Sequence, residues 1–360
     1  MDFYMPVKVY TEENCVWNHK KEIAALGKKA MIVTGRHSAK ANGSYEEVKS
    51  ALDSEGVTSI LFDEVEENPS METVIKARDL GVTEGVDFVI GIGGGSPMDS
   101  AKAIALMIVH KDEPKEYLYT KGADSAALPV VEIPTTCGTG SEVTPYSILT
   151  NTQKNKKGSI AHRIWAKMAL IDYRYLKTAS QKVLCDTAMD AYGHMVESYI
   201  NTNANDYSRM CVGQALAIWS KCKDVLLGNK VPDANDYQNL LTASAMAGMA
   251  ISVSGTSLPH GFSYGLTCEI GYSHGKAVGY FLAGYLKEAP EKDREYLLQT
   301  AGFDSLEDFE GFYKKTCGDE MAPVALLKEI GNDILSNEVK LKNCPYKVDR
   351  EMVARMVGLG

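Results

Sequence analysis

The sequence lacks several features that would tie a protein to a particular cellular environment. It has no run of about 18 apolar residues, the length that a membrane-spanning helix needs. The N-terminal segment MDFYMPVKVY has neither the basic start nor the apolar core of a secretory signal. The eight cysteines stand singly, without a CxxC pair or zinc-ribbon spacing. We therefore expect a cytoplasmic protein with reduced thiols and no membrane partner.

Positive charge is also scarce. The chain has 38 Lys and Arg against 47 Asp and Glu, a formal net charge of −9. Nucleic acids and anionic membranes select basic surfaces, so this balance argues against both as main partners. The hydrophobic share of 45% is enough for a large core. The length of 360 residues predicts about two domains.

Short β-rich runs alternate with helical patterns in the first half of the chain. The runs predict strands at 30–34, 59–62, 87–90 and 129–133, and the apolar spacing predicts helices at 45–55, 71–80 and 97–110. This alternation is typical of a Rossmann-like α/β domain with a parallel sheet. In such sheets ligands bind beyond the carboxyl ends of the strands, so we expect the loops after the strands to carry function.

The loop after the third predicted strand, Gly91–Asp99, is rich in glycine. The successive glycines 93–95 let a backbone approach an anion closely. Ser96 is predicted to cap the next helix, with Pro97 at its first position and Asp99 completing a capping-box-like pattern. The loop does not fit the GxGxxG pattern. It still predicts a phosphate site, because the N–H groups of a helix N-terminus attract anions.

Two other loops also fit a cofactor. Residues 134–144 follow a predicted strand and carry five hydroxyl side chains. At the end of the first strand, Gly35 leaves room for a ribose, and Arg36, Ser38 and Lys40 can donate hydrogen bonds to a 2′-phosphate. No carboxylate stands at this junction to accept from the 2′-hydroxyl of NAD. A solvated basic turn would have the same composition, so spacing alone leaves a 2′-phosphate site and a solvated turn as open alternatives.

The second half of the chain has a different pattern. From about residue 178 nearly every segment reads as helix, most clearly at 181–201, 206–227, 234–252 and 274–286. Proline and glycine stand mainly between these stretches. We therefore expect residues 1–178 to form the α/β domain and residues 179–360 to form an all-helical domain.

Four residues of the helical half could hold a metal ion. Asp190 and His194 are four apart, which places them on one face of a helix. His260 and His274 could add two more imidazoles. A carboxylate and neutral imidazoles suit Fe(II), Zn(II), Mn(II) or Co(II). A single histidine on a helix is more often structural, so spacing alone leaves this site open.

Together these segments resemble the iron-containing (group III) alcohol dehydrogenases. The matching motifs are residues 93–102, 134–142, Asp190 to Glu197, and His260 with His274 fourteen residues later. The resemblance implies a dinucleotide-binding domain, a helical domain and a cleft between them, the architecture of dehydroquinate synthase. It also implies a homodimer that binds iron, with zinc possible. The implied metal ligands are Asp190, His194, His260 and His274.

The resemblance also implies a set of cofactor contacts. They map onto Gly35, Ser38, Asn68, Gly94, Gly95, Ser96, Asp99, Thr135, Thr136 and Thr139. In the family a glycine at the position of Gly35 goes with NADP, in agreement with the charges at this junction, so the resemblance favours NADP over NAD.

Two positions near these motifs depart from the family pattern. Tyr264 stands where many members carry a histidine proposed to relay protons. A phenol can pass a proton, but with a pKa of about 10 it is a poorer base at neutral pH. Cys137 replaces a usual alanine and is expected to make the cofactor loop sensitive to thiol reagents.

The expected reaction is reversible hydride transfer between NADP(H), or NAD(H), and a small alcohol or aldehyde of the butanol or propanediol type. Dehydroquinate synthase and glycerol-1-phosphate dehydrogenase share the architecture, but their substrates need basic pocket residues. Segment 255–265 is mostly apolar or small, which favours a weakly polar substrate. A third reading is a non-catalytic cofactor-binding homologue, whose signature would be missing ligands. None is missing.

Overall fold

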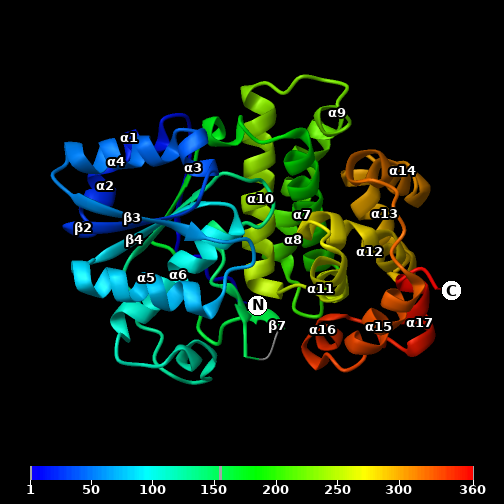
Figure 1. The fold of residues 1–360 in the computed structure, drawn as a ribbon. Coiled ribbons are helices and arrows are strands. Elements are labelled where there is room, and N and C mark those ends of the chain that lie inside the picture. The colour runs from blue at the N-terminus through cyan, green and yellow to red at the C-terminus, as the bar shows by residue number, and fades with distance from the viewer. Residues whose placement is uncertain (1, 154–155, 360) are drawn as a thin grey trace. The chain divides into compact units, whose positions relative to one another are not determined.

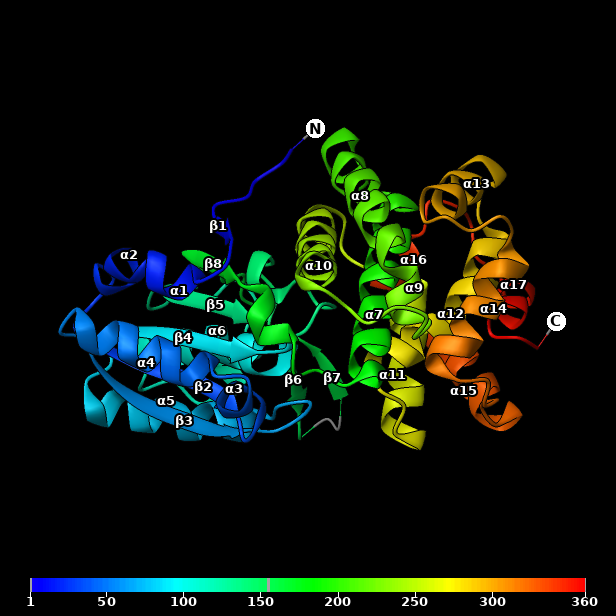
Figure 2. The same ribbon diagram turned by 90° about the horizontal axis from the view of Figure 1, so that it is seen from above.

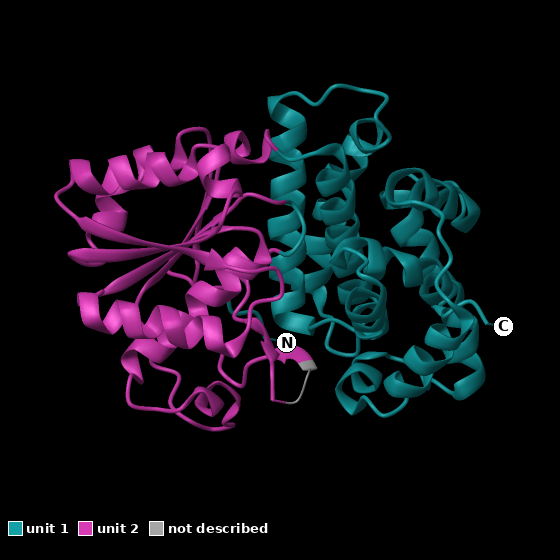
Figure 3. Ribbon diagram, in the orientation of Figure 1, with its two compact units in different colours: residues 1–4, 137–139, 179–360 teal, residues 5–136, 140–178 magenta. Residues whose placement is uncertain are grey.

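The computed structural model describes residues 2–153 and 156–359 (Figure 1). The chain forms two compact units, coloured separately in Figure 3. The sheet unit comprises residues 5–136 and 140–178, and the helical unit comprises residues 1–4, 137–139 and 179–360. The main division falls between Thr178 and Ala179, where the sequence pattern changes. A single boundary cannot describe the short segment 137–139, which belongs to the helical unit.

The sheet unit is built on a six-stranded sheet in which all neighbouring strands are parallel. The strand order is β1-β8-β5-β4-β2-β3 (Figure 2). The predicted parallel α/β fold is thus confirmed, with β1 and β8 added to the four predicted strands. The strands are β1 Lys8–Thr11, β2 Lys29–Gly35, β3 Thr58–Val65, β4 Phe88–Gly93, β5 Val130–Pro134 and β8 Met168–Ile171.

Helices cover both faces of the sheet, and strand β2 shows why. Successive side chains of a strand point to opposite faces. Ala30 and Ile32 pack in a core with α1 to α4, whereas Met31 and Val33 pack in a core with α5 and α6 (Figure 1). Both faces are apolar, so the strand reads as a continuous hydrophobic run. The helices are α1 Cys15–Asn18, α2 Lys20–Ala24, α3 Ser38–Ala41, α4 Ser44–Ser54, α5 Met71–Glu84 and α6 Gly95–Val109.

Shorter elements complete the sheet unit. They are the 3-10 turns η1 Lys115–Tyr119, η2 Ser141–Val143 and η3 Tyr173–Leu176, and an antiparallel pair of strands, β6 Ile148–Asn151 and β7 Lys156–Ser159.

The helical unit is organised around α7, Gln181–Tyr199. Ser180 starts this helix by accepting a hydrogen bond from the Val183 N–H. Residues 188–198 are all buried, because α8, α10 and α12 pack around them. The other elements are α8 Asp206–Trp219, η4 Ser220–Cys222, α9 Lys223–Leu226, α10 Ala234–Ser254, α11 Leu258–Ile270, α12 His274–Glu288, α13 Glu291–Thr300, α14 Leu306–Cys317, α15 Val324–Ile334, α16 Glu338–Asn343 and α17 Arg350–Met356.

Two features of this unit differ from the sequence prediction. The predicted helix 206–227 is interrupted after Trp219, whose buried indole N–H donates to the Ala188 carbonyl at 2.9 Å. The chain then continues as η4 and α9. Helix α11, which carries His260, was not among the predicted stretches. It begins with Pro259 in its first turn, where a missing N–H costs nothing.

Within the described residues, no single helix has the length and hydropathy of a membrane span. Helices α10 and α11 meet that test only as a pair, and the chain bends by 111° between them.

Candidate active site

Asp190 and His194 lie one turn apart on α7, deep inside the helical unit. Gly193 stands between them, and an added Cβ there would lie 2.5 Å from Val278 Cγ1. Helix α12 therefore packs directly against this turn. At the start of α12, Gly275 lies even closer, because its Cβ would meet the Asp186 carbonyl oxygen at 1.6 Å. Glycines thus let α12 bring its first residue, His274, up to α7.

The three predicted histidine ligands all face one oxygen of the fourth predicted ligand, Asp190. Asp190 Oδ1 lies 3.4 Å from Nε2 of His260, 3.6 Å from Nε2 of His274 and 4.0 Å from Nε2 of His194. The ligand atoms of Asp190, His260 and His274 all lie within 4.8 Å of one another. His194 lies outside that group, with its Nε2 4.0 Å from Asp190 Oδ1. The carboxylate and the imidazoles of His260 and His274 form a donor set that suits a divalent transition metal, to which His194 can add a third imidazole.

The polar atoms of this cluster fit a bound cation. In the described part of the chain, neither Asp190 Oδ1 nor His260 Nε2 has a hydrogen-bond partner, although both are buried. Burial lowers the pKa of His194 to about 4, so its imidazole is neutral and can act as a ligand. Burial alone would raise the pKa of Asp190, but the neighbouring imidazoles of His194 and His274 hold it well below its ordinary value. Asp190 is therefore a carboxylate.

Glu197, two turns after Asp190 on α7, fixes the orientation of His260. Its Oε1 accepts hydrogen bonds from His260 Nδ1 at 2.5 Å and from the His260 N–H at 3.2 Å. Its Oε2 accepts from the Ser257 N–H at 2.5 Å. A carboxylate on Nδ1 leaves Nε2 facing the metal position. The sequence motif includes Glu197, but spacing alone assigned it no role.

His194 is oriented by a backbone carbonyl. Its Nδ1 lies 3.1 Å from the Gly138 oxygen, which fixes the tautomer that presents Nε2. An added Cβ at Gly138 would lie 2.8 Å from the Thr187 carbonyl, so this loop needs glycine. The neighbouring Cys137 is fully buried, and burial raises the pKa of its thiol to about 12. Burial and a raised pKa both count against the expected sensitivity of Cys137 to thiol reagents, because thiolates are the reactive form.

Tyr264 lies one turn beyond His260 on α11 and is half-buried. Its ring is nearly parallel to that of His274, with centroids 6.4 Å apart. The structure thus places Tyr264 beside the metal cluster, as a relay residue would require.

The glycine-rich loop lies in the sheet unit, between β4 and α6. Gly93 has a φ of 150°, and an added Cβ would meet Pro97 at 2.7 Å. The Thr135 N–H donates to the Gly93 carbonyl at 2.8 Å, which joins this loop to the threonine-rich loop. The predicted cofactor residues of the sheet unit lie at or after the carboxyl ends of neighbouring strands, and Thr139 is the one member of the set that belongs to the helical unit. They are Gly35, Arg36, Ser38, Asn68, Gly94, Gly95, Ser96, Asp99, Thr135 and Thr136.

The predicted capping pattern of α6 is wrong. The helix begins at Gly95 with Gly94 as N-cap, so Ser96 lies inside its first turn. A glycine cap has no side chain, and its N-terminal N–H groups stay available for an anion. Asp99 instead accepts hydrogen bonds from Ser141 Oγ at 2.5 Å and from the Ile148 N–H at 2.8 Å. Its carboxylate holds neighbouring loops together.

The junction after β2 is less basic than its sequence indicates. Lys40 Nζ lies 2.6 Å from the carboxylate of Asp63 in β3. The two residues are far apart in the sequence, so this ion pair could not be predicted from it. Arg36 and Ser38 are exposed, and an added Cβ at Gly35 would meet its nearest neighbour only at 3.6 Å. A side chain at position 35 would therefore make only ordinary contact with the protein, and Arg36 beside it is an exposed cation.

Asn68 follows β3 in the left-handed conformation, with a φ of 58°. Its carbonyl accepts from Thr150 Oγ1 at 3.0 Å, and its Oδ1 accepts from Lys157 Nζ at 2.6 Å. The residue is thereby fixed beside the β6–β7 pair.

A lysine from another part of the chain lies beside segment 255–265, whose own residues are mostly apolar or small. Lys340 of α16 donates to Thr256 Oγ1, and an added Cβ at Gly261 would lie 3.3 Å from Lys340 Cγ. Burial lowers the pKa of Lys340 to about 8. The composition of segment 255–265 could not predict this neighbour, because the lysine comes from a distant part of the chain.

Glu132 of β5 places a buried carboxyl group next to the strand that leads into the glycine-rich loop. Both carboxyl oxygens are buried, and no group of the described residues hydrogen-bonds to either. Burial raises the pKa of Glu132 well above its ordinary value, so the folded protein holds this proton where the unfolded chain has lost it. Stability therefore falls as the pH rises from the unfolded pKa of about 4.5 toward the folded one.

Replacing Glu132 by glutamine should remove this dependence. We expect wild type and Glu132→Gln to have the same free energy of unfolding at about pH 5. At about pH 8 the variant should be more stable by at least about 1 kcal/mol. Urea unfolding at both pH values measures the difference. A variant less stable at the higher pH would show that Glu132 is ionised in the folded state.

Comparison with known proteins gives matches over most of the chain. The family described as "Iron-containing alcohol dehydrogenase" matches residues 6–173, and "Fe-containing alcohol dehydrogenase family, C-terminal" matches residues 184–311. A solved iron-containing alcohol dehydrogenase from Thermotoga maritima is 35% identical, with a TM-score of 0.90 over 99% of this chain and 98% of that one.

Two curated relatives add to this result. The long-chain primary alcohol dehydrogenase AdhA of Thermoanaerobacter ethanolicus is 33% identical over 269 residues, which span 71% of this chain and 65% of that protein, less than two thirds of its length. The NADPH-dependent butanol dehydrogenase of Clostridium saccharobutylicum is 28% identical over 291 residues, 80% of this chain and 74% of that protein.

Proposed function

Because the chain belongs to the iron-containing alcohol dehydrogenase family of oxidoreductases, we propose that it interconverts a small primary alcohol or diol and its aldehyde with NADP(H). The observation that carries this proposal is the convergence of three imidazole Nε2 atoms on Asp190 Oδ1. A family member that had lost activity would be expected to have lost part of this set.

Some residues around the metal position would bind the ion, and others orient the residues that bind it. When bound, an iron or zinc ion supplies Lewis acidity, which lowers the pKa of an alcohol and stabilises charge on a carbonyl oxygen. Asp190 contributes the negative charge of the donor set. Gly138 and Glu197 orient His194 and His260 through Nδ1, so that each Nε2 is held in position before the ion arrives. The nicotinamide supplies the hydride chemistry, which the protein must orient.

Tyr264 is proposed to pass the hydroxyl proton between substrate and solvent. We expect Tyr264→Phe to lower kcat by about tenfold at neutral pH, less than a well-matched acid–base group would give, because a phenol is a poor base there. Tyr264→His should restore the rate and move its pH dependence toward the pKa of an imidazole. Unchanged pH–rate profiles in both variants would assign Tyr264 a packing role.

Gly35 and Arg36 support NADP over NAD. Gly35→Asp places a carboxylate where a 2′-phosphate would lie, so kcat/KM for NADPH should fall by about tenfold or more while that for NADH is kept or rises. The NADH rate of the same preparation controls for misfolding. An equal fall for both cofactors would indicate that the ribose does not lie at this junction.

A panel of aldehydes tests the reaction itself. The protein, loaded with Fe(II) or Zn(II), is assayed with butyraldehyde, lactaldehyde and succinic semialdehyde, each with NADPH and NADH. Oxidation of NADPH by butyraldehyde is expected. No turnover on any short aldehyde, or carbocycle formation from the sugar-acid phosphate used by dehydroquinate synthase, would overturn the proposal.

The position of Lys340 makes anionic aldehydes an informative part of this panel. If the ammonium group contacts substrate, Lys340→Met should lower kcat/KM for succinic semialdehyde and spare butyraldehyde. Equal effects on both substrates would indicate that the lysine serves only its bond to Thr256.

The cytoplasmic location and the homodimer stay proposals. All eight cysteines are free thiols in the described chain, which is in keeping with a reducing compartment. Size-exclusion chromatography with light scattering measures the oligomeric state.

A further inference from the structure

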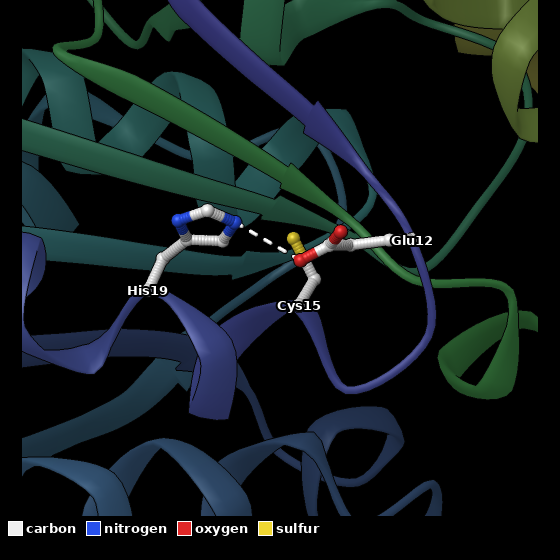
Figure 4. A group of neighbouring side chains, drawn as sticks. All are labelled: Glu12, Cys15 and His19. Carbon is white, nitrogen blue, oxygen red and sulfur yellow. Dashed lines mark hydrogen bonds and ion pairs between the residues drawn. The ribbon is translucent and has the colours of Figure 1, made fainter.

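A second group of metal-binding side chains lies in the sheet unit, on the connection from β1 to α2. Glu12, Cys15 and His19 each direct one ligand atom into the same space, and these atoms lie within 4.8 Å of one another (Figure 4). His19 Nε2 is 3.0 Å from Glu12 Oε1. Cys15 and His19 lie one turn apart around α1, where the His19 N–H donates to the Cys15 carbonyl at 3.2 Å.

The two nitrogens of His19 both face carboxylates. Nε2 faces Glu12, and Nδ1 lies 3.4 Å from Glu22 Oε1. A neutral imidazole carries only one N–H, so it can donate to only one of these acceptors. Glu22 is itself held in place, because its Oε2 accepts from Lys8 Nζ at 2.9 Å and its Oε1 accepts from the Tyr10 hydroxyl at 2.8 Å.

A metal bound at Nε2 requires the tautomer with the proton on Nδ1, which then faces Glu22 as its acceptor, while the Nε2 lone pair points into the same space as the Glu12 oxygen. The Tyr10 ring stacks on the His19 ring with centroids 3.5 Å apart, which holds the imidazole in this orientation.

We propose that Glu12, Cys15 and His19 form a second metal site, for zinc or another divalent cation that binds thiolates, with water as a fourth ligand. Sulfur, imidazole nitrogen and carboxylate oxygen are the three donor types that zinc takes in proteins. Glu22 supplies the carboxylate that accepts from the outer nitrogen of a metal-bound histidine. The chemistry differs from that of the Asp190 cluster, which offers only oxygen and nitrogen.

Binding at this site releases one proton. The Cys15 thiol is fully buried, with Sγ 3.6 Å from the Tyr10 carbonyl oxygen, and it must lose its proton to the solvent when the sulfur–metal bond forms. This cost selects ions with a strong affinity for thiolate. Glu12 is exposed and His19 is half-buried, so an ion can approach from their side.

The sulfur ligand gives the experiment its selectivity. The full-length protein is loaded with Co(II), and the near-ultraviolet thiolate-to-cobalt charge-transfer band is recorded together with the metal content. Wild type should show the band and bind one more equivalent than Cys15→Ser, which should lack the band. Asp190→Ala should keep the band, because it alters only the other site. Cys211→Ser, a matched change of another buried cysteine, should also keep it.

Two results would overturn the proposal. One is a wild-type protein without the band at saturating Co(II). The other is persistence of the band in Cys15→Ser. If that variant does not fold, as circular dichroism would show, Glu22→Gln replaces it, and the second metal equivalent should bind about 10–100-fold more weakly. An unchanged affinity in Glu22→Gln would count against the site.

Discussion

Replacing His260 by alanine should lower kcat/KM by about 10³-fold or more and remove the bound metal from the Asp190 cluster. Two effects add. The change deletes one of three imidazoles around Asp190 Oδ1, and it leaves the buried Glu197 carboxylate without the ring to which it is bonded. A metal acting as Lewis acid contributes several kcal/mol to stabilising the transition state, and each 1.4 kcal/mol is about a factor of ten.

His110→Ala is the matched control for this prediction. His110 lies in the sheet unit, and its Nε2 is 3.1 Å from the Ala126 carbonyl oxygen. Its loss should leave turnover unchanged. Metal content, measured by plasma mass spectrometry on both variants beside kcat/KM, separates loss of the ion from loss of the fold. Full activity and full metal content in His260→Ala would end the assignment of this residue as a ligand.

Glu197→Gln should weaken metal binding by about 100-fold, at the upper end of the range for a residue that orients a ligand. The carboxylate accepts three hydrogen bonds, from His260 Nδ1 and from the N–H groups of His260 and Ser257. A glutamine of the same shape must turn an NH₂ group toward at least one of these donors. His260 then loses the hydrogen bond that sets its tautomer, although it stays in the sequence.

This prediction distinguishes metal affinity from catalysis. At saturating metal, most of the activity of Glu197→Gln should return, because the ion itself restores the orientation of His260. Glu132→Gln is the matched control, since it makes the same change at another fully buried glutamate that has no partner among the described residues. A metal titration that is identical for Glu197→Gln and Glu132→Gln would contradict the orienting role.

The fold of the sheet unit was readable from sequence because its signal is local. A strand buried on both faces is a short apolar run, and a covering helix repeats its apolar residues at helical spacing. Strands β2 to β5 were found in this way. The edge strand β1 was not, because its four residues, Lys8–Thr11, show a mixed and partly exposed pattern. Strand β8 is buried, but its four residues are too few for an apolar run to separate a strand from a helix segment.

The sequence by itself also determined the types of ligand at the site. Asp190 and His194 are linked by the period of the helix, and the order of the four motifs supplied His260 and His274. The glycine-rich loop could be recognised because only glycine permits the backbone geometry found at Gly93. In each case the physical constraint acts within a few residues of the chain.

Tertiary structure alone decided how these residues are paired. Glu197 accepts a hydrogen bond from His260, which is 63 residues away in the sequence. Asp63 forms an ion pair with Lys40. Lys340 donates a hydrogen bond to Thr256, which is 84 residues away. Such contacts depend on which helix faces and strand ends meet, and spacing along the chain carries no record of that. The sequence thus specified the chemical groups, and packing fixed which of them are charged, which are oriented and which are already engaged by a partner.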